Sequence, residues 1–237
     1  MIPLGDSVPS ERTPFISYLL LALNVLVFLY EVALGANAEA FIQVWGTTPA
    51  DILMWRQEPV VLLTLVTSMF LHGGWLHLVG NMLYLGIFGD NVEGIMGHKR
   101  YLFFYLLCGV AANLAQVLIA PTGTIPGVGA SGAIAGILAA YLLSFPRARI
   151  FVGVFLLFYL EVVALPAVVV LGFWFVMQLF NGIAAIGLSA EATMGGVAWW
   201  AHIGGFLAGL ILTPILRQRR RHQFRYLDTV DGLYKGR

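Results

Sequence analysis

Four polar residues interrupt otherwise apolar stretches of this chain, and their types suit acyl-transfer chemistry. Ser131 lies in Gly-Ala-Ser-Gly and His202 in Ala-His-Ile-Gly-Gly, while His77 and Asn81 are four positions apart. A serine hydroxyl becomes a nucleophile when a base within hydrogen-bond reach takes its proton. A neutral imidazole can take that proton and later return it to a leaving amine. No acidic residue is placed to complete a triad, so Ser131 and His202 form a candidate dyad.

His77 and Asn81 fall on one face of a helix because residues four apart stack on each other. They could direct two hydrogen-bond donors at one atom, as an oxyanion hole requires. The backbone amide of Ser131, at a helix start, could add a third donor. The alternative is a structural imidazole-amide pair, and the spacing alone favours neither.

Ser131 and His202 also have structural alternatives. Small residues at four-residue spacing, here Gly132 and Gly136, let helices approach closely, and a serine among them often bonds a backbone carbonyl. His202 could be a hydrogen-bonded structural histidine. The presence of both residue types, each in its own apolar segment, favours the dyad. The histidine spacing does not suggest a zinc site, so no metal or cofactor is predicted.

The segments that carry these residues indicate a membrane protein. The chain has 237 residues, of which 59% are hydrophobic and 11% charged, with a mean hydropathy of +0.86. Its apolar blocks have the length that spans hydrocarbon as a helix. Residues 15–30 are apolar on every face, whereas barrel strands would alternate. The single cysteine, Cys108, excludes an internal disulfide.

We therefore predict an all-α polytopic bundle of six transmembrane helices, at about 14–35, 75–95, 100–120, 128–145, 166–188 and 198–216. The domain would be residues 14–216, flanked by tails at 1–13 and 217–237. The long connection 36–74 is expected to lie partly in the outer interface. Residues 150–165 also look interfacial, because Glu161 and Pro166 argue against one continuous helix from Arg149.

The basic residues orient this bundle. Most of the positive charge lies in the connection between the second and third spans, in that between the fourth and fifth, and after the sixth. The residues are Lys99, Arg100, Arg147, Arg149, Arg217, Arg219, Arg220, Arg221 and Arg225. The opposite side carries only Arg56. By the positive-inside rule, both termini are expected to be cytoplasmic. The second, fourth and sixth spans then run inward, so all four polar residues would lie at one depth near the outer face.

Three motifs in order resemble the rhomboid family of intramembrane serine proteases: HGGWLHLVGN with His72, His77 and Asn81, GASG around Ser131, and AHIGG around His202. The resemblance extends over residues 60–216. It implies Ser131 as nucleophile, His202 as base and acid, and His77, Asn81 and the Ser131 amide as oxyanion donors. It also implies an outward-opening water-filled cavity, a membrane-embedded first loop and a flexible cap at residues 189–197. Glu93 and Gly97 match family positions at the inner end of the second helix, where we expect structural capping.

Two positions depart from the family pattern. Some members place an aromatic residue four positions after the serine, stacked on the histidine, and here that residue is Ala135. The Trp-Arg pair of the first loop is also displaced, because Leu63 and Thr64 stand at its expected position. Trp55 and Arg56 are candidates to replace that pair.

The predicted function is hydrolysis of peptide bonds in or beside transmembrane segments of membrane proteins, near the extracytoplasmic face. The expected partners are these substrates and the lipid bilayer, and a net charge of +1 gives no support for nucleic acid. The compact six-span core suits a prokaryotic inner membrane. The alternatives are an inactive rhomboid-like protein that escorts membrane clients and, less favoured, a small transporter, which would require broken helices or inverted repeats. The oligomeric state is not indicated.

Overall fold

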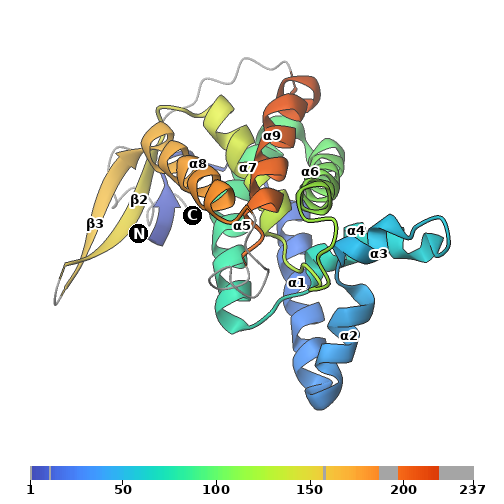
Figure 1. Ribbon diagram of the computed structural model, residues 1–237. Coiled ribbons are helices and arrows are strands. Elements are labelled where there is room, and N and C mark those ends of the chain that lie inside the picture. The colour runs from blue at the N-terminus through green and yellow to red at the C-terminus, as the bar shows by residue number, and fades with distance from the viewer. Residues whose placement is uncertain (1, 11, 157–158, 187–196, 219–237) are drawn as a thin grey trace.

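The computed structural model describes residues 2–10, 12–156, 159–186 and 197–218. The chain is mostly helical (Figure 1), and a helix lies at each of the six predicted positions. These helices are α1 (Phe15–Ala33), α5 (Trp75–Met96), α6 (His98–Ile119), α7 (Ser131–Ser144), α8 (Ala167–Ala184) and α9 (Trp199–Leu216).

Four of these helices, α1, α6, α8 and α9, are long and apolar enough to cross a membrane by themselves. Helix α5 qualifies only together with Pro59–Phe70, from which it is bent by 80°. This gives four to five candidate spans among the described residues, as expected for a polytopic membrane protein. The number of six spans therefore stays a prediction, since α7 is a shorter apolar helix.

Helix α7 is shorter than a membrane span, and it is the most buried helix at the centre of the bundle. Its 14 residues extend about 21 Å at 1.5 Å per residue, against a hydrocarbon core of about 30 Å. Every residue from Gly132 to Tyr141 is buried. Because α7 begins at Ser131, the serine lies inside the bundle and not at the end of a full-length span.

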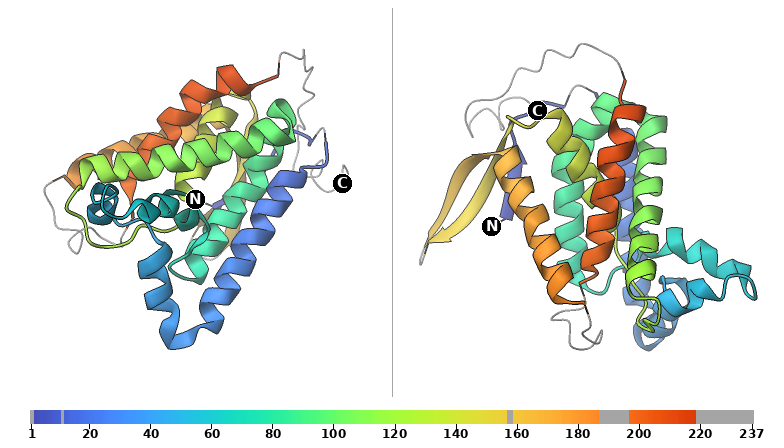
Figure 2. Two further views of the ribbon diagram at one scale, coloured as in Figure 1. Left: turned by 90° about the vertical axis from the view of Figure 1, so that its right-hand side faces the viewer. Right: turned by 45° about the horizontal axis from the view of Figure 1, so that its top comes forward.

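Helix α9 packs against α6, α7 and α8, and it lies beside α6 along most of its length (Figure 2). Glycines allow this packing. A Cβ built on Gly209 would lie 2.4 Å from the carbonyl oxygen of Gly136 in α7, and one on Gly204 would lie 2.3 Å from Cβ of Ala115 in α6. The Gly-rich sequence of α9 thus allows the serine and histidine helices to approach closely.

The carboxylate of Glu93 joins α5 to the first turn of α1. It accepts hydrogen bonds from the backbone nitrogens of Ile16 and Ser17 at 2.9 and 2.8 Å, and from Ser17 Oγ at 2.8 Å. The first-turn N–H groups of a helix lack partners within the helix, and a carboxylate is favourable there. Glu93 therefore has a structural role, and the helix end that it caps is the start of α1 and not the end of α5.

The predicted interfacial connection is a series of short helices: η1 (Gly35–Asn37), α2 (Ala38–Trp45), α3 (Pro49–Leu53), η2 (Pro59–Leu63), α4 (Thr64–Thr67) and η3 (Ser68–Phe70). Helices α2 and α3 extend away from the bundle (Figure 1). Their region exposes large apolar side chains such as Val44, Leu53 and Val60. Between α2 and α3, the backbone of Thr47 forms two hydrogen bonds with that of Gly127, which connect this region to the segment before α7.

A three-stranded antiparallel sheet corrects the all-α prediction. Its strands are β1 (Ile2–Asp6), β2 (Arg149–Leu156) and β3 (Tyr159–Pro166), in the order β1-β2-β3. The segment expected to be interfacial is thus a hairpin, and the predicted tail 1–13 contributes a strand. Residues such as Ile150, Phe151 and Val152 favour strands, but a short apolar run does not distinguish a strand from a buried helix segment.

The sheet is attached at the end of the bundle away from Ser131. The buried side chain of Asp6 accepts hydrogen bonds from Asn91 Nδ2, at 2.9 Å, and from the hydroxyl of Tyr141. Asn91 lies near the end of α5, and Tyr141 near the end of α7. The sheet therefore cannot contribute to a site at the start of α7.

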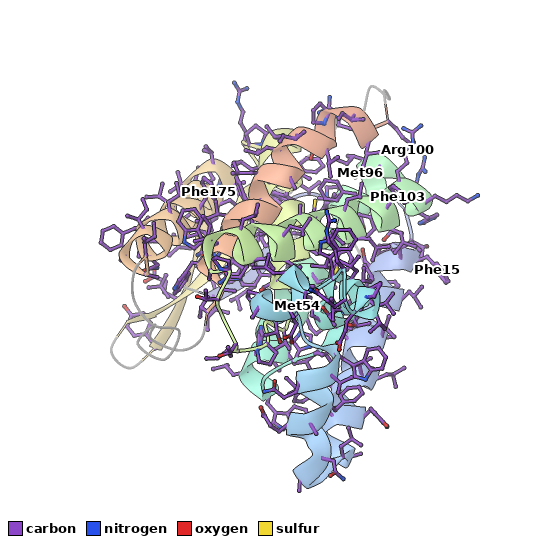
Figure 3. The ribbon with its side chains drawn as sticks, turned by 45° about the vertical axis from the view of Figure 1, so that its right-hand side comes forward. Phe15, Met54, Met96, Arg100, Phe103 and Phe175 are labelled. Atoms are coloured by element: carbon purple, nitrogen blue, oxygen red, sulfur yellow. The ribbon has the colours of Figure 1, made fainter. Side chains whose placement is uncertain are left out.

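Large apolar side chains cover the outside of the bundle. Phe15 and Phe103 point outward in Figure 3, and each is 62% exposed. Phe180 on α8 and Ile211 on α9 are each 66% exposed. A monomer in water rarely presents so much apolar surface, whereas lipid tails would cover it.

Candidate active site

Ser131 and His202 are in hydrogen-bond contact. Ser131 is the first residue of α7 and His202 the fourth residue of α9, and Ser131 Oγ lies 2.8 Å from His202 Nε2. A hydroxyl at this distance from an imidazole nitrogen can transfer its proton directly. The structure therefore brings the predicted dyad together, although its catalytic role stays a prediction.

Gly129, two residues before the serine, allows the other two candidates to approach. Its φ of +122° favours glycine, and its backbone nitrogen donates to the carbonyl oxygen of Ser68 at 2.9 Å. A Cβ at this position would lie 2.7 Å from both Cε1 and Nε2 of His77, and 3.5 Å from Nδ2 of Asn81. His77 and Asn81 therefore lie against the Gly-Ala-Ser-Gly segment.

The hydrogen bonds of His77 indicate its tautomer. The backbone nitrogen of Gly73 donates to Nδ1 of His77 at 3.4 Å, so Nδ1 is the acceptor and Nε2 carries the proton. It is this Nε2 that lies against Gly129. His77 thus presents a donor toward the segment that holds the serine.

Asn81 presents the second donor. Its side chain is 7% exposed, and Nδ2 has no hydrogen-bond acceptor among the described residues. A buried amide without a partner is costly, so such a group normally serves a ligand, a water or a reaction intermediate. Nδ2 of Asn81 thus lies beside Gly129 with its hydrogen-bonding capacity unused.

All four residues line one cavity of about 820 Å³ among the described residues. Its walls come from α5, α7, α8 and α9, and from residues 126–128 before α7. A second cavity of about 140 Å³ reaches the other side of Ser131, where Thr47, Asn113 and Gln116 supply polar groups. Ser131 thus lines both the larger and the smaller cavity.

Two residues that the sequence reasoning did not identify contact His202 from α8. Gln178 Oε1 lies 2.8 Å from His202 Nδ1, and the ring of Trp174 lies 5.9 Å from the imidazole at an angle of 35°. The sequence did contain a signal for Gln178, because an amide within an apolar helix is itself a functional-site candidate. These two contacts restrict the orientation of His202, for which Ala135 supplies no aromatic ring.

Other expected residues lie away from the dyad. Trp55 and Arg56 contact each other, with the guanidinium 5.1 Å from the ring centre, but neither lines either of these cavities. His72 is buried with its ring 5.2 Å from that of His77, and its backbone nitrogen lies 3.3 Å from the Glu31 carboxylate. The predicted cap at 189–197 and the basic tail at 217–237 fall almost entirely outside the described residues.

The sequence is similar to a known protein family and to several curated proteins. Residues 58–219 match the model of the Rhomboid domain. The chain is 29% identical over 205 residues to the rhomboid protease GluP of Bacillus subtilis, covering 84% of this chain and 35% of the relative. It is 29% identical over 200 residues to the human mitochondrial presenilin-associated rhomboid-like protein, covering 81% and 45%.

A chloroplastic relative, rhomboid-like protein 11 of Arabidopsis thaliana, is 33% identical over 135 residues, covering 57% of this chain and 44% of the relative. The chain thus spans less than half the length of each of these curated relatives. The relatives carry both protease and rhomboid-like names, and they come from a bacterium, a mitochondrion and a chloroplast.

Proposed function

The chain belongs to the rhomboid family, and on that premise we propose that it is an intramembrane serine endopeptidase with a Ser131-His202 dyad. The observation that carries the proposal is the 2.8 Å contact between Ser131 Oγ and His202 Nε2, beside the donors gathered around Gly129. The proposed substrates are membrane proteins, cut in or next to a transmembrane segment.

In the first half of the reaction, His202 Nε2 takes the proton of Ser131 while Oγ attacks the carbonyl carbon of the scissile peptide bond. Negative charge then develops on the carbonyl oxygen, which would accept hydrogen bonds from His77 Nε2, Asn81 Nδ2 and the Ser131 amide. The intermediate collapses when the carbon-nitrogen bond breaks. The imidazolium of His202 returns its proton to the leaving amine.

In the second half, water replaces the amine. His202 takes a proton from water, hydroxide attacks the acyl carbon, and the carbon-oxygen bond to Ser131 breaks with return of the proton to Oγ. Water must therefore reach a serine within the bundle. The smaller cavity beside Ser131 includes Thr47, Asn113 and Gln116 in its lining, and these side chains offer hydrogen-bonding groups for such water.

The position of the site favours a substrate drawn from the bilayer. Ser131 starts a helix about 9 Å shorter than a hydrocarbon core of about 30 Å, and the bundle around it is covered by apolar side chains. Within a helix, peptide carbonyls are already hydrogen-bonded, so the substrate must unwind locally before attack. Helix-breaking and small residues near the cut should therefore favour cleavage.

The proposed topology has both termini in the cytoplasm and the site near the extracytoplasmic face. Its support is the distribution of lysine and arginine, which concentrates in the connections 97–100 and 145–149 and after α9. All four site residues lie at the amino-terminal ends of α5, α7 and α9, which then share one side. A prokaryotic inner membrane is the proposed location.

Labelling with a fluorophosphonate, which reacts covalently with activated serines, tests the dyad without knowledge of the substrate. Wild-type protein should be labelled at Ser131, whereas His202→Ala and Ser131→Ala should not. Ser144→Ala, at the other end of α7, is the matched control and should be labelled like wild type. Failure to label a folded wild-type protein would favour the alternative of an inactive protein that escorts membrane clients.

A further inference from the structure

Gln178 is a polar side chain in an apolar helix, and both ends of its amide are bonded. It is 6% exposed, Oε1 lies 2.8 Å from His202 Nδ1, and Nε2 donates to the carbonyl oxygen of Trp174 at 3.3 Å. Polar groups inside a membrane are rare unless they are partnered and functional. The partner here is the candidate base.

The second hydrogen bond determines which way the amide faces. If the amide were rotated by 180°, its oxygen would face the carbonyl oxygen of Trp174, and two acceptors would meet. The bonded orientation therefore directs Oε1 at His202. Because Oε1 accepts only, His202 Nδ1 must carry the proton.

This tautomer is the one that a general base at position 202 needs. With the proton on Nδ1, Nε2 has a free electron pair and faces Ser131 Oγ. When Nε2 takes the serine proton, the ring becomes charged, and its hydrogen bond to Gln178 becomes stronger. The contact therefore stabilises the transition state more than the ground state, which raises kcat.

Trp174 lies one helical turn before Gln178 and contacts the same imidazole. Its ring is 5.9 Å from that of His202 at 35°, while Trp199 meets the ring edge-on at 6.3 Å and 89°. Ala135, on α7, has no aromatic ring that could stack on His202. Helix α8 thus supplies both a hydrogen bond and an aromatic contact that limit rotation of His202.

We propose that Gln178 is a positioning residue that holds His202 in its Nδ1-protonated form, with Trp174 beside the same imidazole ring. This inference rests on the proposed function, in which His202 is the base. Gln178 itself touches no substrate atom. It acts through the ring that it orients.

Three variants test the inference by their effect on catalysis. Gln178→Met keeps the length and volume but removes the acceptor, and it should lower kcat about 10- to 100-fold with little change in KM. Gln178→Glu restores an acceptor. Its kcat should therefore return to most of the wild-type value at pH values above the pKa that limits activity on the acidic side. Because a carboxylate favours the imidazolium, the fall of kcat on the acidic side should occur at a higher pH than in wild type. Val176→Leu, 58% exposed on the same helix, is the control and should resemble wild type.

A purely structural role for Gln178 would not move the pH profile, and it would not alter the histidine ring. Nitrogen NMR of protein labelled with ¹⁵N-histidine reports the tautomer directly, with His202 assigned by its loss in His202→Gln. Wild type should show protonated Nδ1 at neutral pH, and Gln178→Met should populate the other tautomer.

Each outcome decides one of the two proposals. Protonated Nε2 in wild type, or a Gln178→Met protein with unchanged tautomer, kcat and pH profile, would overturn the role of Gln178. A wild type that neither cleaves nor takes up a fluorophosphonate would contradict the proposed function. In that case the NMR result would still decide whether Gln178 holds the ring of His202.

Discussion

A methyl group added to Gly205 would lie 1.9 Å from the carbonyl oxygen of Gly132, so α7 and α9 touch through their backbones. Gly132 follows Ser131, and Gly205 lies one turn after His202. The same contact recurs one turn later, between Gly209 and Gly136. The distance between Ser131 and His202 is thus set by helix packing that no larger residue would permit.

Gly205→Ala should separate α7 from α9 and lengthen the 2.8 Å contact of the dyad. Misplacement by about 1 Å can cost about 100-fold in rate, so we expect at least that loss of kcat/KM, together with a lower Tm. Gly172→Ala is the matched control, since a Cβ there meets nothing within 4 Å. Equal activity of the two variants would show that backbone contact does not determine the dyad distance.

Asn81→Ala should lower kcat by about 100- to 1000-fold and change KM little, because its amide would bond only the oxyanion. Val79→Ala on the same helix, where Val79 is 57% exposed, is the control. The kinetics of purified variants on one model substrate would measure both effects. A higher KM with unchanged kcat would instead assign Asn81 to substrate binding.

Glu93→Ala should destabilise the fold without entering the chemistry, because three donors in α1 would lose their buried acceptor. We expect a loss of about 2–4 kcal/mol and a Tm lower by several degrees, measured by thermal unfolding in detergent. Glu58→Ala, at an exposed carboxylate in the first loop, should leave Tm unchanged. A Tm that moves equally in both variants would argue against the capping role of Glu93.

The site was largely predictable from sequence because membrane helices make polar residues conspicuous. Ser131, His202, His77 and Asn81 each interrupt an apolar segment near a helix start, and the structure brings them to one cavity. Gln178 had the same signal but lies in the middle of α8, away from any motif. Its importance depends on which face of α8 meets α9, which periodicity alone does not reveal.

The sheet was not predicted because its strands show no regular alternation of apolar and polar residues. Residues 150–156 alternate neither in polarity nor in a helical pattern, and the residues that pair with them in β1 are distant in sequence, from Asp6 with Ile150 to Ile2 with Gly153. Pairing over such a separation depends on the bundle, which brings Asn91 and Tyr141 to Asp6. Tertiary context thus determined the secondary structure of both segments.

The proposed topology can be tested by cysteine labelling, because Cys108 is buried. Arg56 and Arg147 are both exposed, in the first loop and after α7. In intact cells or spheroplasts, a membrane-impermeant maleimide should label Arg56→Cys but not Arg147→Cys, and both after permeabilisation. Labelling of Arg147→Cys alone before permeabilisation would reverse the orientation.

The central claim is that Ser131 and His202 together hydrolyse peptide bonds of membrane proteins. It is tested most directly by purified protein in detergent or liposomes, incubated with a single-pass substrate that carries small and helix-breaking residues near its outer end. Wild type should cut this substrate, whereas Ser131→Ala and His202→Ala, shown to be folded by an unchanged Tm, should leave it intact. Cleavage at the wild-type rate by either variant would contradict the dyad.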